Sequence, residues 1–437
     1  MALPDTSVLN PGVRKREVLG WAMYDFANSG YTTVVLTAVF NAYFVGVVAG
    51  GASWGTLAWT LTLALSNIAV MLATPLLGAW ADARAAKKRV LAFSTVGCVL
   101  ATAALAGVGP GSLALAVVAI VVSNFCYAVG EQITAAFLPE LARREALGRV
   151  SGWGWSLGYF GGMLTLGLSL GYVLWAQGQG LPATHFVPVS MLITAGVYAL
   201  ASLATFALLR EHARPQPQGQ AQLRGATAQA LARLRHTWQE AARYRDFRWL
   251  LACAAAYQAG ISVVIALAAI YAAEVLGFKQ TETMALIFLV NIAAAAGAFS
   301  FGFFQDRIGH RRALGLTLWG WVGMTALAVV ATTPGPFWAA AVLAGLCMGS
   351  SQSAGRALAG LFAPPAQLAE FYGLWTFATR LSAIAGPVTY GLVTWATDGD
   401  HRLAIGVTGL FFLLGLVLLR QVDVQRGQAA ALNTGSP

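Results

Sequence analysis

The chain consists of long apolar stretches separated by short polar turns, and this pattern predicts its architecture. A helix needs about 20 mainly apolar residues to cross a bilayer. The stretches are continuous, unlike the ~10-residue alternating segments of a membrane β-barrel, so they predict helices. We predict twelve transmembrane helices: 17–48, 54–80, 89–108, 112–137, 151–176, 187–209, 248–274, 281–304, 313–333, 337–361, 371–396 and 402–420.

Composition strengthens this prediction. Hydrophobic residues make up 58% of the 437 residues and charged residues only 10%, whereas soluble domains carry about 25% charged residues. A soluble enzyme, a disordered chain and a secreted disulfide scaffold are therefore excluded. The four cysteines lie in apolar stretches without a Cys-x-x-Cys pair and are interpreted as buried thiols. The histidines form no cluster along the sequence, so we expect neither a metal nor a cofactor.

The positions of the lysines and arginines indicate the membrane topology. All but four of the 27 lysines and arginines fall on one side of the predicted membrane, although the net charge of +10 would otherwise suggest nucleic-acid binding. By the positive-inside rule, this side is cytoplasmic. We therefore predict a multi-pass protein of the inner (cytoplasmic) membrane, with both termini in the cytoplasm and no nucleic-acid partner. Its first span contains Asp25 and is too long for a cleavable leader.

The middle of the chain interrupts the pattern. A Pro/Gln/Gly-rich stretch opens segment 210–247, and a basic, partly amphipathic stretch follows. We interpret it as a cytoplasmic linker with an amphipathic helix on the membrane surface. It separates a bundle at 1–209 from a bundle and short cytoplasmic tail at 248–437. Gly78 and Asp82 recur 224 residues later, which indicates that the two six-helix bundles are pseudo-symmetric copies.

Four charged residues lie inside predicted spans. Asp25 and Glu131 belong to the first half, and Arg356 and Arg380 to the second. At 1.5 Å per residue, each lies ~12–15 Å from the cytoplasmic side, close to the middle of the ~30 Å hydrocarbon core. Intramembrane charges are candidate functional residues. Glu131 and Arg356 are related by an offset of 225 residues, so we expect them to face each other.

Two interpretations of these charges stay open at the sequence level. In the structural one, Glu131 forms a permanent pair that locks the halves, and Asp25 bonds within its own bundle. In the functional one, the arginines bind a carboxylate through two parallel hydrogen bonds. An apolar environment raises the pKa of an acid, and a nearby guanidinium lowers it. An acid under both influences can bind and release a proton.

Polar and aromatic neighbours extend the candidate site. Asn28 shares a helix face with Asp25, and Asn124 and Tyr127 share one with Glu131. Spans of the second half add Tyr257, Gln258, Gln352 and Trp375. We predict that all of these side chains contribute to substrate binding or coupling.

Two loops carry a related signature. The first contains Gly78, Asp82 and Arg84, and the second contains Gly302, Asp306, Arg307 and Gly309. Glycine lets two helices approach, and the aspartate can bond to a helix amino end or to an arginine of the other bundle. An interaction present in only one conformation biases a two-state equilibrium. We therefore predict gating loops; the alternative is a merely solvated basic loop.

With both loops in view, the chain resembles the major facilitator superfamily over essentially its whole length. The second loop keeps the family's G-x-x-x-D-R-x-G pattern, whereas the first has Ala83 and Ala85 where Arg and Gly are usual. The run from Trp21 to Tyr31 is similar to a bacterial group related to the autophagy-linked vacuolar amino-acid effluxers of yeast. The resemblance implies an all-α major facilitator fold, alternating access, a monomer and efflux of amino acids or similar metabolites.

We therefore expect a secondary active transporter that moves small polar or zwitterionic metabolites outward, coupled to protons. The expected partners are a small-molecule substrate, protons and the lipid bilayer. The alternative is a proton-coupled exporter of amphipathic drugs. We expect no enzyme, because no catalytic constellation is visible at membrane depth, and no ATP-driven pump, because no G-x-x-x-x-G-K-[ST] loop occurs.

Overall fold

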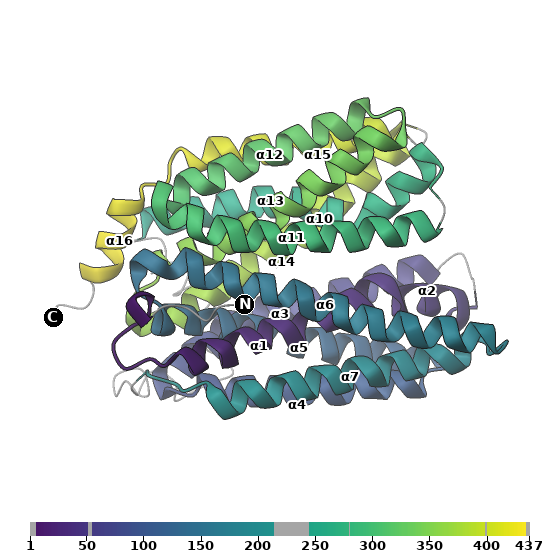
Figure 1. Ribbon diagram of the computed structural model, residues 1–437, viewed down its shortest axis with the longest axis horizontal. Coiled ribbons are helices and arrows are strands. Elements are labelled where there is room, and N and C mark those ends of the chain that lie inside the picture. Colours follow the sequence, from purple (N-terminus) through teal and green to yellow (C-terminus); the bar gives the residue numbers. More distant parts are fainter. Residues whose placement is uncertain (1–5, 51–54, 214–243, 279, 398–399, 434–437) are drawn as a thin grey trace.

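The computed structural model describes residues 6–50, 55–213, 244–278, 280–397 and 400–433. Long helices lie side by side along the long axis of the molecule (Figure 1). The described helices are α1 (Lys15–Tyr31), α2 (Phe40–Tyr43), α3 (Gly55–Arg84), α4 (Lys87–Ala104), α5 (Leu113–Leu141), α6 (Leu147–Gly178), α7 (Ala183–Leu208), α10 (Arg245–Leu276), α11 (Gln280–Ile308), α12 (His310–Val330), α13 (Pro334–Phe362), α14 (Leu368–Ala396), α15 (His401–Leu419) and α16 (Val424–Asn433). The expected amphipathic linker helix falls mainly on residues outside these ranges.

Eight helices within the described ranges are long and apolar enough to cross a membrane. A ninth candidate is the pair Leu61–Thr74 and Leu76–Arg84, which is bent by 41°. The described part of the chain is therefore all-helical, and the chain is a multi-pass membrane protein. The number of twelve spans stays a prediction.

The first predicted span is not one continuous α-helix. After α1, the backbone winds as a π-helix over Thr32–Ala38, breaks at Val39 (φ −119°, ψ −60°), and passes through α2 into a second π-helix at Phe44–Val48. The break follows a run of threonine and valine, whose β-branched side chains have restricted rotamers in an α-helix. Thr37 donates its hydroxyl to the carbonyl of Thr32, 3.0 Å away, which supports the wider turn.

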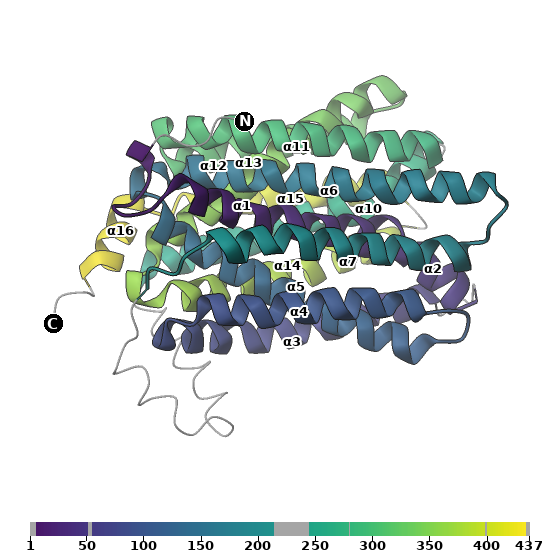
Figure 2. The ribbon, with the colours of Figure 1, turned by 60° about the horizontal axis from the view of Figure 1, so that its bottom comes forward.

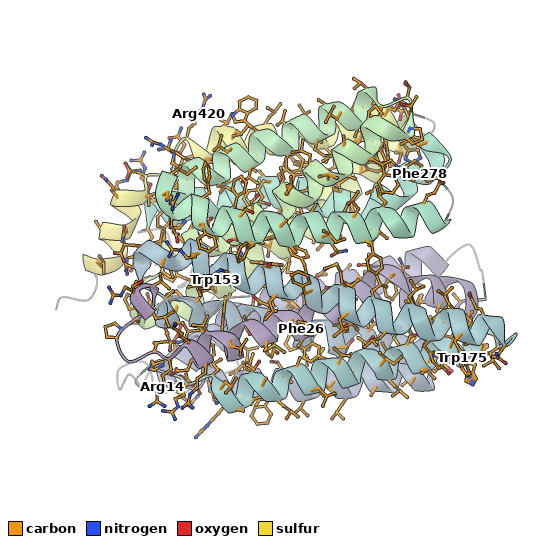
Figure 3. The ribbon with its side chains drawn as sticks, viewed as in Figure 1. Arg14, Phe26, Trp153, Trp175, Phe278 and Arg420 are labelled. Atoms are coloured by element: carbon orange, nitrogen blue, oxygen red, sulfur yellow. The ribbon has the colours of Figure 1, made fainter. Side chains whose placement is uncertain are left out.

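The helices form two groups that meet along a seam (Figure 1). In the turned view of Figure 2, the two groups overlap. Helices α1 and α3–α7 form one half, and α10–α15 form the other. Across the seam, α6 packs against α11 and α13, and α14 packs against α3 and α5. One end of the molecule holds the α3–α4, α5–α6 and α11–α12 turns, and Figure 3 shows Arg14 and Arg420 there. We call this the basic end.

Glycine allows α6 and α11 to cross closely at the seam. A Cβ atom on Gly152 would lie 2.3 Å from the carbonyl oxygen of Ala298 and 2.9 Å from the Cα atom of Gly302. Both distances are too short for any side chain, so only glycine fits there. Gly302 is the α11 glycine at this crossing.

The two signature turns differ at one related position. Gly309 closes the α11–α12 turn with φ +89°, and Ala85 closes the α3–α4 turn with φ +47°. Both values lie in the left-handed region, where a Cβ atom costs about 1–2 kcal/mol. Ala85 is therefore strained, and Gly309 is not.

The tail contains a helix that the sequence pattern did not predict. Helix α16 lies at the basic end against α10 and α13. The Nε and Nη2 atoms of Arg426 each lie 2.7 Å from the carboxylate of Asp246, which opens α10. The tail is thus tied to the first helix of the second half.

We expect Gly309→Ala to lower the free energy of unfolding by about 1 kcal/mol, because it introduces left-handed strain. Ala85→Gly should raise it by about 0.5 kcal/mol, since the relief of strain exceeds the entropy that glycine adds to the unfolded chain. Unfolding of the detergent-purified protein measures both changes. Gly335→Ala is the control, because its Cβ atom would meet open space. Equal effects of Gly309→Ala and Gly335→Ala would contradict this explanation.

Candidate functional site

Two ion pairs join the halves inside the helical region. Arg356 of α13 places its Nη1 atom 2.8 Å from Oδ2 of Asp25 on α1. Arg380 of α14 places its Nη2 atom 2.8 Å from Oε2 of Glu131 on α5. The four predicted intramembrane charges are thus brought together in two pairs, each crossing the seam.

The pairing differs from the expected one. Glu131 pairs with Arg380, not with Arg356 as the shared sequence offset suggested. Asp25 pairs across the seam and not within its own half. An offset relates two positions by pseudo-symmetry, but contact also depends on how far each helix is rotated and where it crosses its neighbour.

The Asp25–Arg356 pair is almost enclosed, with only 11% and 8% of the two side chains exposed. Arg356 also donates to Ser151 on α6, from Nε to the hydroxyl (3.0 Å) and from Nη2 to the carbonyl (2.8 Å). Its guanidinium lies over the rings of Trp21 (4.8 Å) and Trp155 (5.2 Å). Arg356 is thus an arginine of one half inserted into the other, with its charge balanced.

The sequence of α6 makes room for this arrangement. A Cβ atom on Gly154 would lie 2.5 Å from Oδ2 of Asp25 and 2.6 Å from the Trp21 ring. Trp21 and Asp25 are four residues apart and therefore share a face of α1. The Trp21 indole N–H donates to the carbonyl of Thr134 at 2.7 Å, which fixes the ring beneath the guanidinium.

The Glu131–Arg380 pair is more open. Glu131 is 35% exposed and Arg380 is 17% exposed. The Arg380 guanidinium lies 5.7 Å from the ring centre of Tyr127, which stacks on Tyr31. Within the described ranges, the Nε atom of Arg380 is buried without a hydrogen-bond partner. This pair therefore has an accessible acid and an unused guanidinium donor.

Two predicted polar residues are engaged within the first half. Asn28 accepts a hydrogen bond from the hydroxyl of Tyr198 on α7 at 2.6 Å. Asn124 donates to the hydroxyl of Ser66 on α3 at 2.9 Å and is buried. In this conformation both side chains hold helices of one half together.

The predicted residues of the second half form two local contacts. Gln258 on α10 donates to Gln352 on α13 at 2.8 Å. Tyr257 and Trp375 both border Gly355, whose Cβ atom would lie 2.4 Å from the Tyr257 hydroxyl and 2.9 Å from the Trp375 ring. These contacts place Tyr257 and Trp375 beside α13, next to the residue that precedes Arg356.

The signature aspartates cap helices of the opposite half. Asp306, on α11, accepts the backbone N–H groups of Gly148 and Arg149 at the start of α6, both at 3.1 Å. Asp82, on α3, accepts the N–H of Glu370 in the first turn of α14 at 3.1 Å. A carboxylate stabilises the positive end of a helix. Both contacts tie the halves together at the basic end.

Sequence reasoning missed the partner of Asp82. Lys87 counted as one residue of a basic loop, yet it is 1% exposed. Its Nζ atom lies 2.8 Å from Asp82 and 2.9 Å from Glu140 on α5. The sequence signal available was the Pro139–Glu140 pair at the end of α5. This pair does not indicate that Glu140 lies close to Lys87, which is more than 50 residues away in the sequence.

The remaining loop residues have different roles. Arg84 and Arg307 are exposed and take no part in either cap. Gly78 and Gly302 are both buried. Gly309 provides the left-handed turn described above.

Comparison with known proteins agrees with this architecture. Residues 42–432 match the family model described as vacuole effluxer Atg22 like. An MFS-type transporter of Bacillus subtilis, YxiO, is 24% identical over 91% of this chain and 93% of its own length. An autophagy-related protein 22-1 of Aspergillus niger is 28% identical, over 43% of this chain and only 33% of that protein.

Solved structures show the same fold. A human organic anion transporter superposes with a TM-score of 0.71 at 16% identity, covering 93% of this chain and 99% of that one. The E. coli fucose:proton symporter superposes with a TM-score of 0.68 at 13% identity, covering 93% and 98%.

Together these findings define the class: the chain is a multi-pass membrane transporter with the major facilitator fold, not an enzyme. More particularly, it belongs to the Atg22-like family.

We expect Asp25→Asn to lower the free energy of unfolding by about 3 kcal/mol, because it leaves a buried guanidinium without a counter-charge. Glu131→Gln should cost less than about 1 kcal/mol, since that pair is partly exposed. Unfolding of the detergent-purified protein compares the two, with exposed Glu145→Gln as the control. A similar loss for both acids would contradict the distinction between a closed and an open pair.

Proposed function

We propose that this chain is a proton-coupled secondary transporter that exports small zwitterionic metabolites such as amino acids by alternating access. In this proposal two six-helix bundles, 1–209 and 248–437, provide twelve spans of the cytoplasmic membrane. Both termini and the basic end face the cytoplasm, because basic loops remain on that side. The transporter acts as a monomer.

The observation that carries the proposal is the open Glu131–Arg380 pair at the seam. A zwitterion offers a carboxylate to the guanidinium and an ammonium group to the acid. Arginine suits this role because its planar fork binds a carboxylate through two parallel bonds. The exposed part of Glu131 and the unused Nε atom of Arg380 support it.

Competition at Glu131 supplies the coupling. A proton and a substrate ammonium group both neutralise this carboxylate, so they bind in turn and not together. Glu131 is ionised during the step that carries substrate outward, and it is protonated during the return step. A proton gradient directed inward then drives export. Among the structural neighbours, the fucose transporter is described as a proton symporter and the human protein as an organic anion transporter.

The second pair sets the conformational equilibrium in this proposal. Opening of the basic end has to withdraw Arg356 from Asp25 and Ser151, and to release both aspartate caps. Each of these contacts favours the state in which this end is closed. They are therefore assigned to gating and not to substrate binding, which revises the sequence-based role of Arg356.

A second candidate function is export of amphipathic drugs. The stacked Tyr31 and Tyr127 rings and the neighbouring Trp155 and Tyr159 rings favour it, since their flat apolar surfaces lie close to the charged pairs. In that case Glu131 still carries the proton, but Arg380 has no ligand.

Flux in proteoliposomes tests the proposal. Vesicles are loaded with a panel of labelled amino acids, and a pH gradient of either sign is imposed. We expect at least one amino acid to move in the direction opposite to the proton flux that the pH gradient drives. Arg380→Gln should reduce its flux more than tenfold, because a charge-assisted bidentate contact is lost. Glu131→Gln should weaken substrate binding, because the amide carries no charge for the ammonium group, and the exchange that remains should no longer respond to pH.

Glu145→Gln is the control, because it removes an exposed acid from a surface loop. It should transport as the unmodified protein does. If no amino acid moves, but an amphipathic dye does and still moves in Arg380→Gln, the drug-export alternative replaces the proposal.

A further inference from the structure

A cavity of about 310 Å³ lies at the basic end, between the two halves and apart from the two ion pairs. One wall comes from the end of α5 and the start of α6, including Pro139 and Leu147. The opposite wall comes from the turn between α13 and α14, including Pro365 and Leu368. His212, just after α7, also lines it. A molecule bound here would touch both halves.

The cavity is lined by an arginine that has an unused hydrogen-bond donor. Arg144 lines it, and the Nη1 atom of Arg144 is buried without a hydrogen-bond partner in the described part of the chain. A buried donor that lacks an acceptor costs free energy. An anion in the cavity would provide that acceptor.

The other charges near the cavity are already balanced. Glu140 also lines it, but its Oε1 atom is 2.9 Å from the ammonium group of Lys87. Its Oε2 atom accepts the backbone N–H of His212 at 3.1 Å. The His212 ring lies 2.7 Å from Glu17, outside the cavity lining. Glu145 acts on the charge of Arg144, so a ligand here would meet the Nη1 donor without an acceptor and not an unpaired charge.

The starts of two helices belong to the wall. Leu147 and Leu368 are the first residues of α6 and α14, and both line the cavity. Asp306 and Asp82 already cap these two helix ends, so the ends themselves add no preference for an anion. The prolines and leucines of the wall favour an apolar body on the same molecule.

We propose that this cavity binds the carboxylate of a small, mainly apolar organic acid. The carboxylate lies against Arg144, and the apolar body fills the space between the α5–α6 and α13–α14 turns. Because the bound acid contacts both halves, it stabilises the state in which the basic end is closed and slows transport. This site is separate from the Glu131–Arg380 pair and does not depend on the proposed substrate.

Binding of benzoate to the purified full-length transporter tests this, with neutral benzamide as the probe of matching shape. Thermal unfolding is measured over a concentration series of each. We expect benzoate to raise the unfolding temperature saturably and benzamide to have no such effect. Arg144→Gln should weaken the benzoate response about tenfold or more, as expected for loss of a charged hydrogen bond.

Two control variants locate the site. Arg143→Gln removes an exposed neighbouring arginine that does not line this cavity and should leave the response unchanged. Arg380→Gln should also keep the response, even where it abolishes transport. Equal responses to benzoate and benzamide would overturn the proposal. So would a response that persists in Arg144→Gln but disappears in Arg380→Gln, which would place the acid at the central pair.

Discussion

The cost of placing charge inside a membrane dominates this structure. A buried ion is stable only with a partner and satisfied hydrogen bonds. The acids of the two pairs, Asp25 and Glu131, belong to the first half, and the arginines, Arg356 and Arg380, to the second. Their charge balance in this conformation therefore comes from across the seam. Any motion that separates the halves has to supply replacement partners, such as water, a proton or a substrate.

The two pairs differ in how replaceable their partners are. Arg356 is surrounded by Asp25, Ser151 and two tryptophan rings, so its removal disrupts several contacts at once. Glu131 is one-third exposed, so a solute can approach it without disturbing the packing. The enclosed pair is thus suited to hold a conformation, and the open pair to exchange its partner. The aspartate caps at the basic end act in the same direction as the enclosed pair, because they join helix ends of opposite halves.

Sequence reasoning predicted the helical segments, the four intramembrane charges and the signature loops because each has a local cause. Apolar length predicts a span, and a charge within it is conspicuous. Partner choice has no such local cause: Glu131 meets Arg380 through the rotation and crossing of α5 and α14, which no sequence offset encodes. The same holds for Lys87, which is buried only because Asp82 and Glu140 converge on it. Hydropathy does not depend on how the backbone winds, so it did not predict the π-helical break after α1.

In the proposed mechanism, substrate and proton compete for Glu131. The most direct measurement is the pH change when the transported amino acid is added to the purified protein in weakly buffered solution, over a series of starting pH values. Binding to the unmodified protein should release a proton, whereas Glu131→Gln, at a concentration high enough for it to bind the amino acid, should release none. Binding by the unmodified protein without proton release would contradict this mechanism.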